Sequence, residues 1–166
     1  MDRFTSIEQA EVSNLLKQLK TSSEVLNVST RSLTDEVSFI EDTINELNIG
    51  VTTEVLCDKS VSEDGLLNTE LKLRYGKETG HWGFVVSEHI EDQHFYSPDD
   101  RISNRSWTFR DAPRELRLRA VVKIPDLLKA MLRETNQLAE RVSSSASFAS
   151  DLAATMKSIG SAEGQR

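Results

Sequence analysis

Two long helical patterns lie near the two ends of the sequence. The second of them runs from Ile124 to Ile159, and its apolar and small residues follow one another in steps that alternate between three and four. This is the a/d heptad of a helix that packs against another helix. Pro125 and Asp126 suit a first helical turn, so the pattern predicts a single helix roughly 50 Å long at 1.5 Å per residue. The heptad positions are Leu128, Met131, Thr135, Leu138, Val142, Ser145, Ala149, Leu152, Met156 and Ile159.

The first long pattern covers residues 5–49, which contain neither glycine nor proline. Thr5 to Glu8 fits a capping box at its start, and Asn48-Ile49-Gly50 supplies a left-handed stop at its end. The heptad is interrupted by a stutter between Leu33 and Val37, which unwinds a supercoil locally. We therefore predict a second long helix. Its heptad positions are Val12, Leu15, Leu19, Ser22, Leu26, Ser29, Leu33, Val37, Ile40, Ile44 and Leu47.

Between the two helical patterns the hydrophobic period changes from about 3.6 to two. Apolar residues alternate with polar ones at 51–57, 71–75 and 82–86. A polar turn at 60–65 and a loop from Gly76 to Gly80, with a glycine at each end, separate these runs. The pattern predicts an antiparallel meander with one face buried and the other solvated.

The segment before the last helix supports two interpretations. Residues 88–104 are polar and predict an exposed loop, and 106–109 predicts a short fourth strand. Pro113 at the start favours a helix over 113–123. The same residues also alternate between apolar and charged, so a strand remains the competing interpretation for this stretch.

Together these elements predict an α+β protein: a small antiparallel meander of three to four strands, flanked by two long antiparallel helices with coiled-coil-like heptads. Residues 1–49 form one stalk helix, 50–123 the head with its basic segment 101–123, 124–160 the other stalk helix, and 161–166 a flexible tail. The first helix ends where the sheet begins and the last begins where the sheet ends. We therefore expect the two helices to run antiparallel if they pair.

Composition narrows the class of protein. Of the 166 residues, 37% are apolar and 28% charged, which suits helices that bury only one stripe. The sequence has no apolar run near 18 residues, so no membrane-spanning helix and no membrane association are predicted. Cys57 is the only cysteine, which excludes an internal disulfide and a cysteine-based zinc site. A reducing, cytoplasmic location is expected.

Charge is distributed unevenly along the chain. The net charge is −7, but residues 101–123 hold 7 basic and 2 acidic side chains. If 113–123 is helical, Arg110, Arg114 and Arg117 lie along one side near the positive N-terminal end of that helix, where guanidinium groups favour phosphate or carboxylate. The basic residues of this segment are Arg101, Arg105, Arg110, Arg114, Arg117, Arg119 and Lys123.

Three interpretations of this basic segment stay open. The arginines could pair with the acidic first helix and strands of the same chain, an interpretation that the excess of acid elsewhere favours. They could bind an acidic protein partner. They could also bind nucleic acid or a nucleotide, with Trp82, Trp107, Tyr75 and Phe84 as stacking residues, although such aromatics more often form a core. The candidate binding residues are Arg105, Arg110, Arg114, Arg117 and Arg119.

Catalytic chemistry is not indicated. The sequence has no phosphate-binding glycine loop, nucleophile elbow or zinc-protease motif. His89 and His94 lie among acidic residues, but their spacing matches no standard metal site. Cys57 on an alternating strand is typical of a buried, inert thiol. We predict no enzyme activity, no metal and no cofactor.

The sequence therefore favours a non-catalytic assembly or adaptor protein, such as an accessory subunit, that forms a homo-oligomer through its long helices. It would present the head, with its arginine cluster, to an acidic protein partner. The alternative function is a nucleic-acid or nucleotide-binding module. The expected oligomer interface comprises Leu15, Leu19, Leu26, Ile40, Leu138, Val142, Leu152 and Met156.

Overall fold

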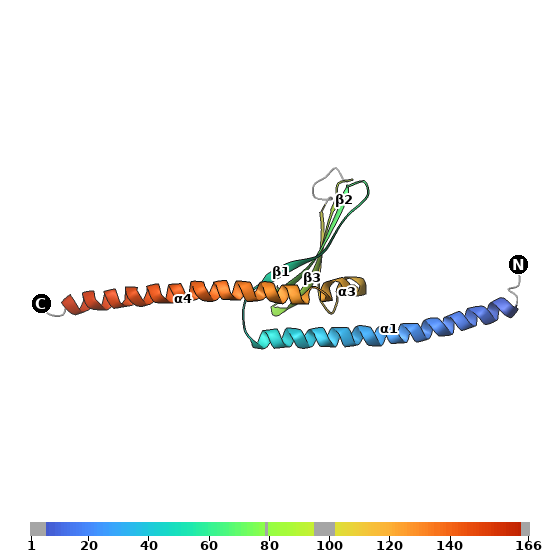
Figure 1. Cartoon of the computed structure of the whole chain (residues 1–166), viewed down its shortest axis with the longest axis horizontal. Coiled ribbons are helices and arrows are strands. Elements are labelled where there is room, and N and C mark those ends of the chain that lie inside the picture. Colours follow the sequence, from blue (N-terminus) through green and yellow to red (C-terminus); the bar gives the residue numbers. More distant parts are fainter. Residues whose placement is uncertain (1–5, 79, 95–101, 164–166) are drawn as a thin grey trace.

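The computed structural model describes residues 6–78, 80–94 and 102–163. Figure 1 shows two long helices that extend from a head made of a sheet and one short helix. The chain is thus α+β, as the sequence predicts. Its elements are α1 (Ser6–Glu46), β1 (Thr53–Val61), β2 (Leu67–Glu78), β3 (His81–Asp92), β4 (Ile102–Thr108), α3 (Arg114–Val121) and α4 (Ile124–Glu163).

The sheet is an antiparallel meander in the order β1-β2-β3-β4, so every strand pairs with its neighbour in the sequence. Leu73 pairs with Val55 on one side and Val86 on the other, and Tyr75 pairs with Phe84. Because side chains alternate along a strand, this register places Leu73, Tyr75, Phe84 and Val86 on one face, whereas Val85, 2% exposed, lies on the other. The three helices cover that face, since their buried residues join the same core cluster.

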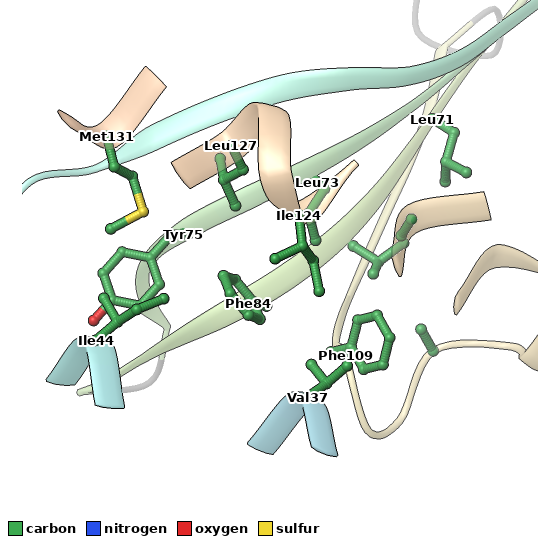
Figure 2. Packing of buried hydrophobic residues seen from close by; sticks show 13 residues of the cluster. Val37, Ile44, Leu71, Leu73, Tyr75, Phe84, Phe109, Ile124, Leu127 and Met131 are labelled. Carbon is green, nitrogen blue, oxygen red and sulfur yellow. The ribbon is translucent and has the colours of Figure 1, made fainter. Parts of the chain in front are cut away.

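The core lies between this apolar sheet face and the helices (Figure 2). α4 contributes Leu127, which is 0% exposed, whereas the neighbouring heptad position Leu128 is 39% exposed. On α4 the core therefore contains Leu127 in place of the heptad position Leu128, while the next heptad position, Met131, is buried as expected. The buried cluster consists of Val37, Ile44, Leu71, Leu73, Tyr75, Phe84, Val86, Phe109, Ala112, Ala120, Ile124, Leu127 and Met131.

The two long helices do not form the antiparallel pair expected from the sequence. In Figure 1, α1 and α4 extend from the head in opposite directions and run in the same sense along the molecule. The expectation assumed that the head only reverses the direction of the chain between the two long helices. In the structure α3 and a turn at Val122–Lys123 lie between the sheet and α4, so the chain does not pass directly from the last strand into the long helix.

Half of each long helix extends beyond the head. All side chains of residues 11–29 are exposed, and so are those of residues 136–157. We call these segments the α1 arm and the α4 arm. Each is about 30 Å long at 1.5 Å per residue. Their apolar residues include Leu19, 64% exposed, and Leu152, 51% exposed. Within the chain, no described residue covers these apolar positions.

Several boundaries differ from the sequence-based expectation. The expected exposed loop at 88–104 is wrong in part, because β3 extends to Asp92 and β4 already begins at Ile102; residues 95–101 lie outside the described part. The expected hairpin loop from Gly76 to Gly80 lies between β2 and β3 but is too long, because β2 extends to Glu78 and Gly76 is buried and pairs with Gly83. The side chains on the solvent-exposed face of an antiparallel sheet are polar, so a strand can extend there without a hydrophobic pattern in its sequence.

Other boundaries are confirmed. The segment that admitted both a helix and a strand is helix α3, with Pro113 at its N-cap position. Asn48 and Gly50 both have positive φ angles, 48° and 66°, and terminate α1 as expected. α4 continues to Glu163, past the expected end at 160.

Candidate functional site

An open cleft between α1 and α3 gathers four arginines. It has a volume of about 600 Å³. One wall is a face of α1, where positions three, four and seven residues apart fall on the same side of a helix. The other wall is the turn after β4 and the first two turns of α3. The lining residues are Asn27, Thr30, Arg31, Thr34, Asp35, Arg110, Arg114 and Arg117.

Local structure on the α3 side brings the arginines together. Thr108 and Asp111 close the turn after β4, with the Thr108 hydroxyl donating to Asp111 Oδ2 at 2.6 Å. Pro113 then starts α3 with a fixed φ of −49°. Arg114 and Arg117 follow three residues apart on one face of the helix. Arg110 lies in the turn before α3 and not on the helix, but it lines the same cleft as Arg114 and Arg117.

Arg114 and Arg117 contact uncharged groups of α1. Arg114 Nη2 donates a hydrogen bond to Asn27 Oδ1 at 3.0 Å, and Arg117 Nη1 donates to the Thr34 hydroxyl at 2.8 Å. The Thr34 hydroxyl in turn donates to the Thr30 carbonyl at 2.9 Å. These bonds hold α3 against α1 and fix the positions of the two guanidinium groups without neutralising their charge.

The cleft has unused capacity for hydrogen bonds to an anion. The Nε atoms of Arg114 and Arg117 are buried, and neither has an acceptor among the described residues. A buried donor without a partner costs about 1–3 kcal/mol and calls for a physical explanation. An anion that enters the cleft and shifts these side chains would supply the missing acceptors.

Electrostatics also favours an anion. Asp35 is the one carboxylate in the lining, against four guanidinium groups. Within the described part of the chain, none of Arg31, Arg110, Arg114 and Arg117 forms an ion pair. Internal compensation of this charge is therefore limited to Asp35 in the lining and to Glu41, which interacts electrostatically with Arg110 without forming an ion pair.

The other basic residues of segment 101–123 lie elsewhere. Arg119 forms ion pairs with Asp58 and Glu115, both at 3.3 Å, and Lys123 pairs with Asp126 at 3.4 Å. Arg105 lines a separate hollow with Glu54, Glu70 and Lys72. Arg101 lies outside the described residues. The predicted cluster of five thus divides into three cleft residues and two that lie apart.

Arg31 is the cleft residue that sequence reasoning missed. It belongs to α1, where acidic residues outnumber basic ones, so the charge of that segment does not indicate a basic site. A signal was present in the heptad stutter between Leu33 and Val37, because α1 begins to contact the head at this point. Leu33 packs against the core cluster and Val37 is buried in it. The polar residues just before the stutter, Thr30 and Arg31, therefore face α3.

Aromatic residues take no part in the cleft. Trp82 stacks on Tyr75 with ring centroids 5.6 Å apart, and Phe84 meets the edge of Tyr75 at 5.8 Å. Trp82 and Trp107 pack against the core, and Tyr75 and Phe84 are buried in it. The lining of the cleft contains no aromatic side chain. A platform for stacking bases, as single-stranded nucleic-acid sites use, is thus missing from its described lining.

The titratable residues discussed from the sequence, His89, His94 and Cys57, lie outside the cleft in surroundings typical of structural residues. His89 contacts Asn104 Oδ1 at 2.6 Å, and His94 contacts Asp92 Oδ1 at 2.8 Å, so hydrogen bonding raises the pKa of His94. No group of three His, Cys, Asp or Glu side chains within the described ranges is arranged to hold a metal ion. Burial raises the pKa of the Cys57 thiol to about 11, which is typical of an inert thiol.

The predicted oligomer-interface residues divide into one that packs in the head and seven that lie on the arms. Ile40 packs against the head's own core. The other seven lie on the two arms and are between 40% and 66% exposed. They are Leu15, Leu19, Leu26, Leu138, Val142, Leu152 and Met156.

Comparisons with known proteins give no relative from which to infer a function. No family model, curated protein or solved structure matches this chain. Among the described residues, no helix has the length and apolar character needed to cross a membrane.

Proposed function

We propose that this chain is a non-catalytic assembly protein, or adaptor, that self-associates through the α1 and α4 arms and presents its arginine cleft to an acidic protein partner. The observation that carries the proposal is the exposure of both arms. Their heptad stripes are largely apolar, and no residue in the described part of the chain covers either of them. Such a stripe is typical of a helix that pairs with another helix.

Helix stability supports the same conclusion. Most of the stability of a helix in a protein comes from packing of its amphipathic face, and the described side chains of both arms are all exposed. The α4 arm contains Ser143, Ser144, Ser145, Ser147 and Ser150, which have lower helix propensity than alanine or leucine. Packing against a partner helix would supply the stability that propensity does not.

A second copy of this chain is the partner that the charges favour. The α1 arm contains Glu11, Lys17, Lys20 and Glu24, and the α4 arm contains Glu140, Arg141, Asp151 and Lys157. Each arm has two acids and two bases and is neutral overall. A copy of the chain thus meets no net repulsion along either arm, and no oppositely charged partner is called for.

Light scattering on a size-exclusion column tests self-association. The wild-type protein should have a mass above the 18.7 kDa of one chain. Leu19→Asp and Leu152→Asp, which place a charge in each stripe, should each return the mass to that of a single chain. The matched controls Asn14→Asp and Ser147→Asp place the same charge on the opposite faces and should leave the mass unchanged. A wild-type monomer would end the proposal.

The cleft favours an acidic protein over nucleic acid because it combines convergent guanidinium groups with an absence of aromatic lining. Arg31 and Arg110 are the residues to test, because both are exposed and neither holds α3 on α1. Arg31→Glu with Arg110→Glu should abolish binding of a fluorescent poly-glutamate peptide in low salt. The control pair Arg105→Glu with Arg133→Glu reverses two charges away from the cleft and should retain most of the binding.

The alternative function, binding of nucleic acid or a nucleotide, is distinguished by the probe. A fluorescent oligothymidylate should bind more weakly than the peptide to the wild-type protein at the same salt concentration. Tighter binding of the oligonucleotide, with an affinity that falls steeply with salt and depends on Arg31 and Arg110, would favour the alternative. Binding of both probes by the Arg31→Glu/Arg110→Glu variant would exclude the cleft as the site.

A further inference from the structure

The two arms have a geometry that determines how copies of the chain meet, given the proposed self-association on which this inference rests. We infer that the α4 arm of one copy packs in parallel on the α1 arm of the next, in a head-to-tail assembly. Both helices run in the same sense, and their arms extend from opposite sides of the head (Figure 1). A copy displaced along this direction therefore brings its α1 arm beside the α4 arm of the first.

The head indicates where that second α1 would begin. Ile44 near the end of α1 and Met131 of α4 both belong to the core and lie beside Tyr75 (Figure 2). α1 ends at Glu46, soon after this contact. Beyond Thr135 the stripe of α4 therefore has no α1 beneath it, and the α4 arm begins there. A second copy's α1, placed end to end with the first, would occupy this free length.

The heptads limit that placement to registers seven residues apart, and the end-to-end position of the two α1 helices selects one of them. When Ser6 of the second copy lies next to residue 136, each α1 position meets the α4 position numbered 130 higher, as Val12 meets Val142. This register aligns a with a and d with d, as a parallel two-stranded coiled coil requires. The facing pairs in the arms are Val12–Val142, Leu15–Ser145, Leu19–Ala149, Ser22–Leu152 and Leu26–Met156.

Volume complementarity supports the register. Three of the five pairs place a leucine opposite a serine or alanine, so that large and small side chains alternate between the two helices. A parallel pair of two α4 arms would instead place Ser145 opposite Ser145 and Ala149 opposite Ala149. Two successive layers would then lack apolar volume, and core voids are destabilising.

An antiparallel pairing between copies is less compatible with the head. It would place the base of one α1 arm, at Ser29, beside the base of the α4 arm, near Thr135. The incoming helix would then continue into the region where the first copy's own α1 already packs on the sheet. The parallel arrangement avoids this overlap because the second head lies one α1 length away.

Head-to-tail contacts join two different surfaces and leave one free arm at each end, so the assembly stays open unless its geometry closes a ring. The 41 residues of α1 set the repeat along the axis at about 60 Å. Wild-type protein should therefore show masses beyond the dimer that rise with concentration, and negative-stain electron microscopy should show linear particles with that repeat.

Cysteine cross-linking tests the register, because Cys57 is the only native thiol. In a Cys57→Ser background, a chain carrying both Leu19→Cys and Ala149→Cys should oxidise to a ladder of covalent dimers, trimers and larger species. Each single variant should remain monomeric on a denaturing gel. The control with Leu19→Cys and Ser147→Cys places the second thiol on the outer face of α4 and should give no ladder.

Several outcomes would overturn the inference while leaving self-association intact. Covalent dimers from either single variant would indicate pairing of like arms. A covalent species that stops at the dimer would indicate a closed arrangement. The inference itself predicts that a mixture of the Leu19→Asp and Leu152→Asp proteins forms a one-to-one dimer, since each retains the arm that the other lacks. A wild-type protein that is monomeric by light scattering would instead refute the proposed function itself.

Discussion

The choice of stripe by which α4 packs on the sheet can be tested with two adjacent leucines. Leu127 is 0% exposed in the core cluster, whereas Leu128, the heptad position, is 39% exposed. We predict that Leu127→Ala destabilises the head strongly and that Leu128→Ala does so weakly. The two substitutions remove the same atoms from neighbouring positions of one helix, so helix propensity and chain composition cancel.

The expected magnitude follows from burial. Truncating a fully buried leucine removes its transfer free energy and leaves a cavity, at a cost of about 2–5 kcal/mol. Leu127 lies between α4 and the sheet with no solvent access, so a value in the upper part of that range is expected. Leu128 keeps much of its surface in water, and its truncation should cost about 1 kcal/mol or less.

Urea unfolding followed by tryptophan fluorescence is the appropriate assay. The two tryptophans, Trp82 and Trp107, both pack against the head core, so the signal reports the head and not the arms. With a slope of about 2 kcal/mol per molar urea, a loss of about 4–5 kcal/mol for Leu127→Ala should lower the midpoint by about 2 M or slightly more. Protein concentration must be held constant because association contributes to stability. A larger loss for Leu128→Ala than for Leu127→Ala would refute the packing of α4 described above.

Two further predictions concern titratable side chains in the head. Because burial raises the pKa of Cys57 to about 11, only about one thiol in a thousand is ionised at pH 8. Iodoacetamide should therefore alkylate the folded protein about 100-fold more slowly than the urea-unfolded chain. Equal rates would contradict the burial of this thiol. Burial also raises the pKa of Glu41 above its ordinary 4.5, although the carboxylate accepts a hydrogen bond from the Phe84 N–H. The folded state therefore binds this proton more tightly than the unfolded state, and the contribution of Glu41 to the free energy of unfolding should fall as pH rises above 4.5. Glu41→Gln keeps an acceptor for the Phe84 N–H and should remove this part of the pH dependence. Urea unfolding of the variant and the wild type at pH 4.5 and pH 7 measures the difference. An unchanged pH dependence would be inconsistent with the described environment of Glu41.

Local patterns predicted most of the secondary structure. The absence of glycine and proline from 5–49 and the Asn48–Gly50 stop located α1, and Pro113 correctly favoured a helix at the ambiguous segment. What failed was the extent of β3 and β4. His89, Glu91 and Asn104 are polar, yet they pair within the sheet. Backbone hydrogen bonding extends these strands, and hydrophobic periodicity does not record it.

The arrangement of the helices could not be predicted from the same patterns. A heptad indicates that a helix has a partner, but it does not say which helix or in which direction. Leu127 and Leu128 illustrate the limit, since both are leucines and only contact with the sheet distinguishes them. The sequence likewise predicted only part of the cleft. Arg110, Arg114 and Arg117 were found by their spacing, whereas Arg31 reaches them only through the packing of α1 on the head.

The order of the elements has a consequence for the newly made chain. α1 is synthesised first, but the surface that it packs on comes from later residues, and Phe109 lies 72 positions after its cluster partner Val37. At about 5–20 residues per second, a ribosome needs about 4–14 s to cover that distance. During this interval the whole apolar stripe of α1, including the part later buried by the head, is open to other helices. The nascent chain therefore passes through a stage at which chaperones and neighbouring nascent chains can bind α1 before its own sheet exists.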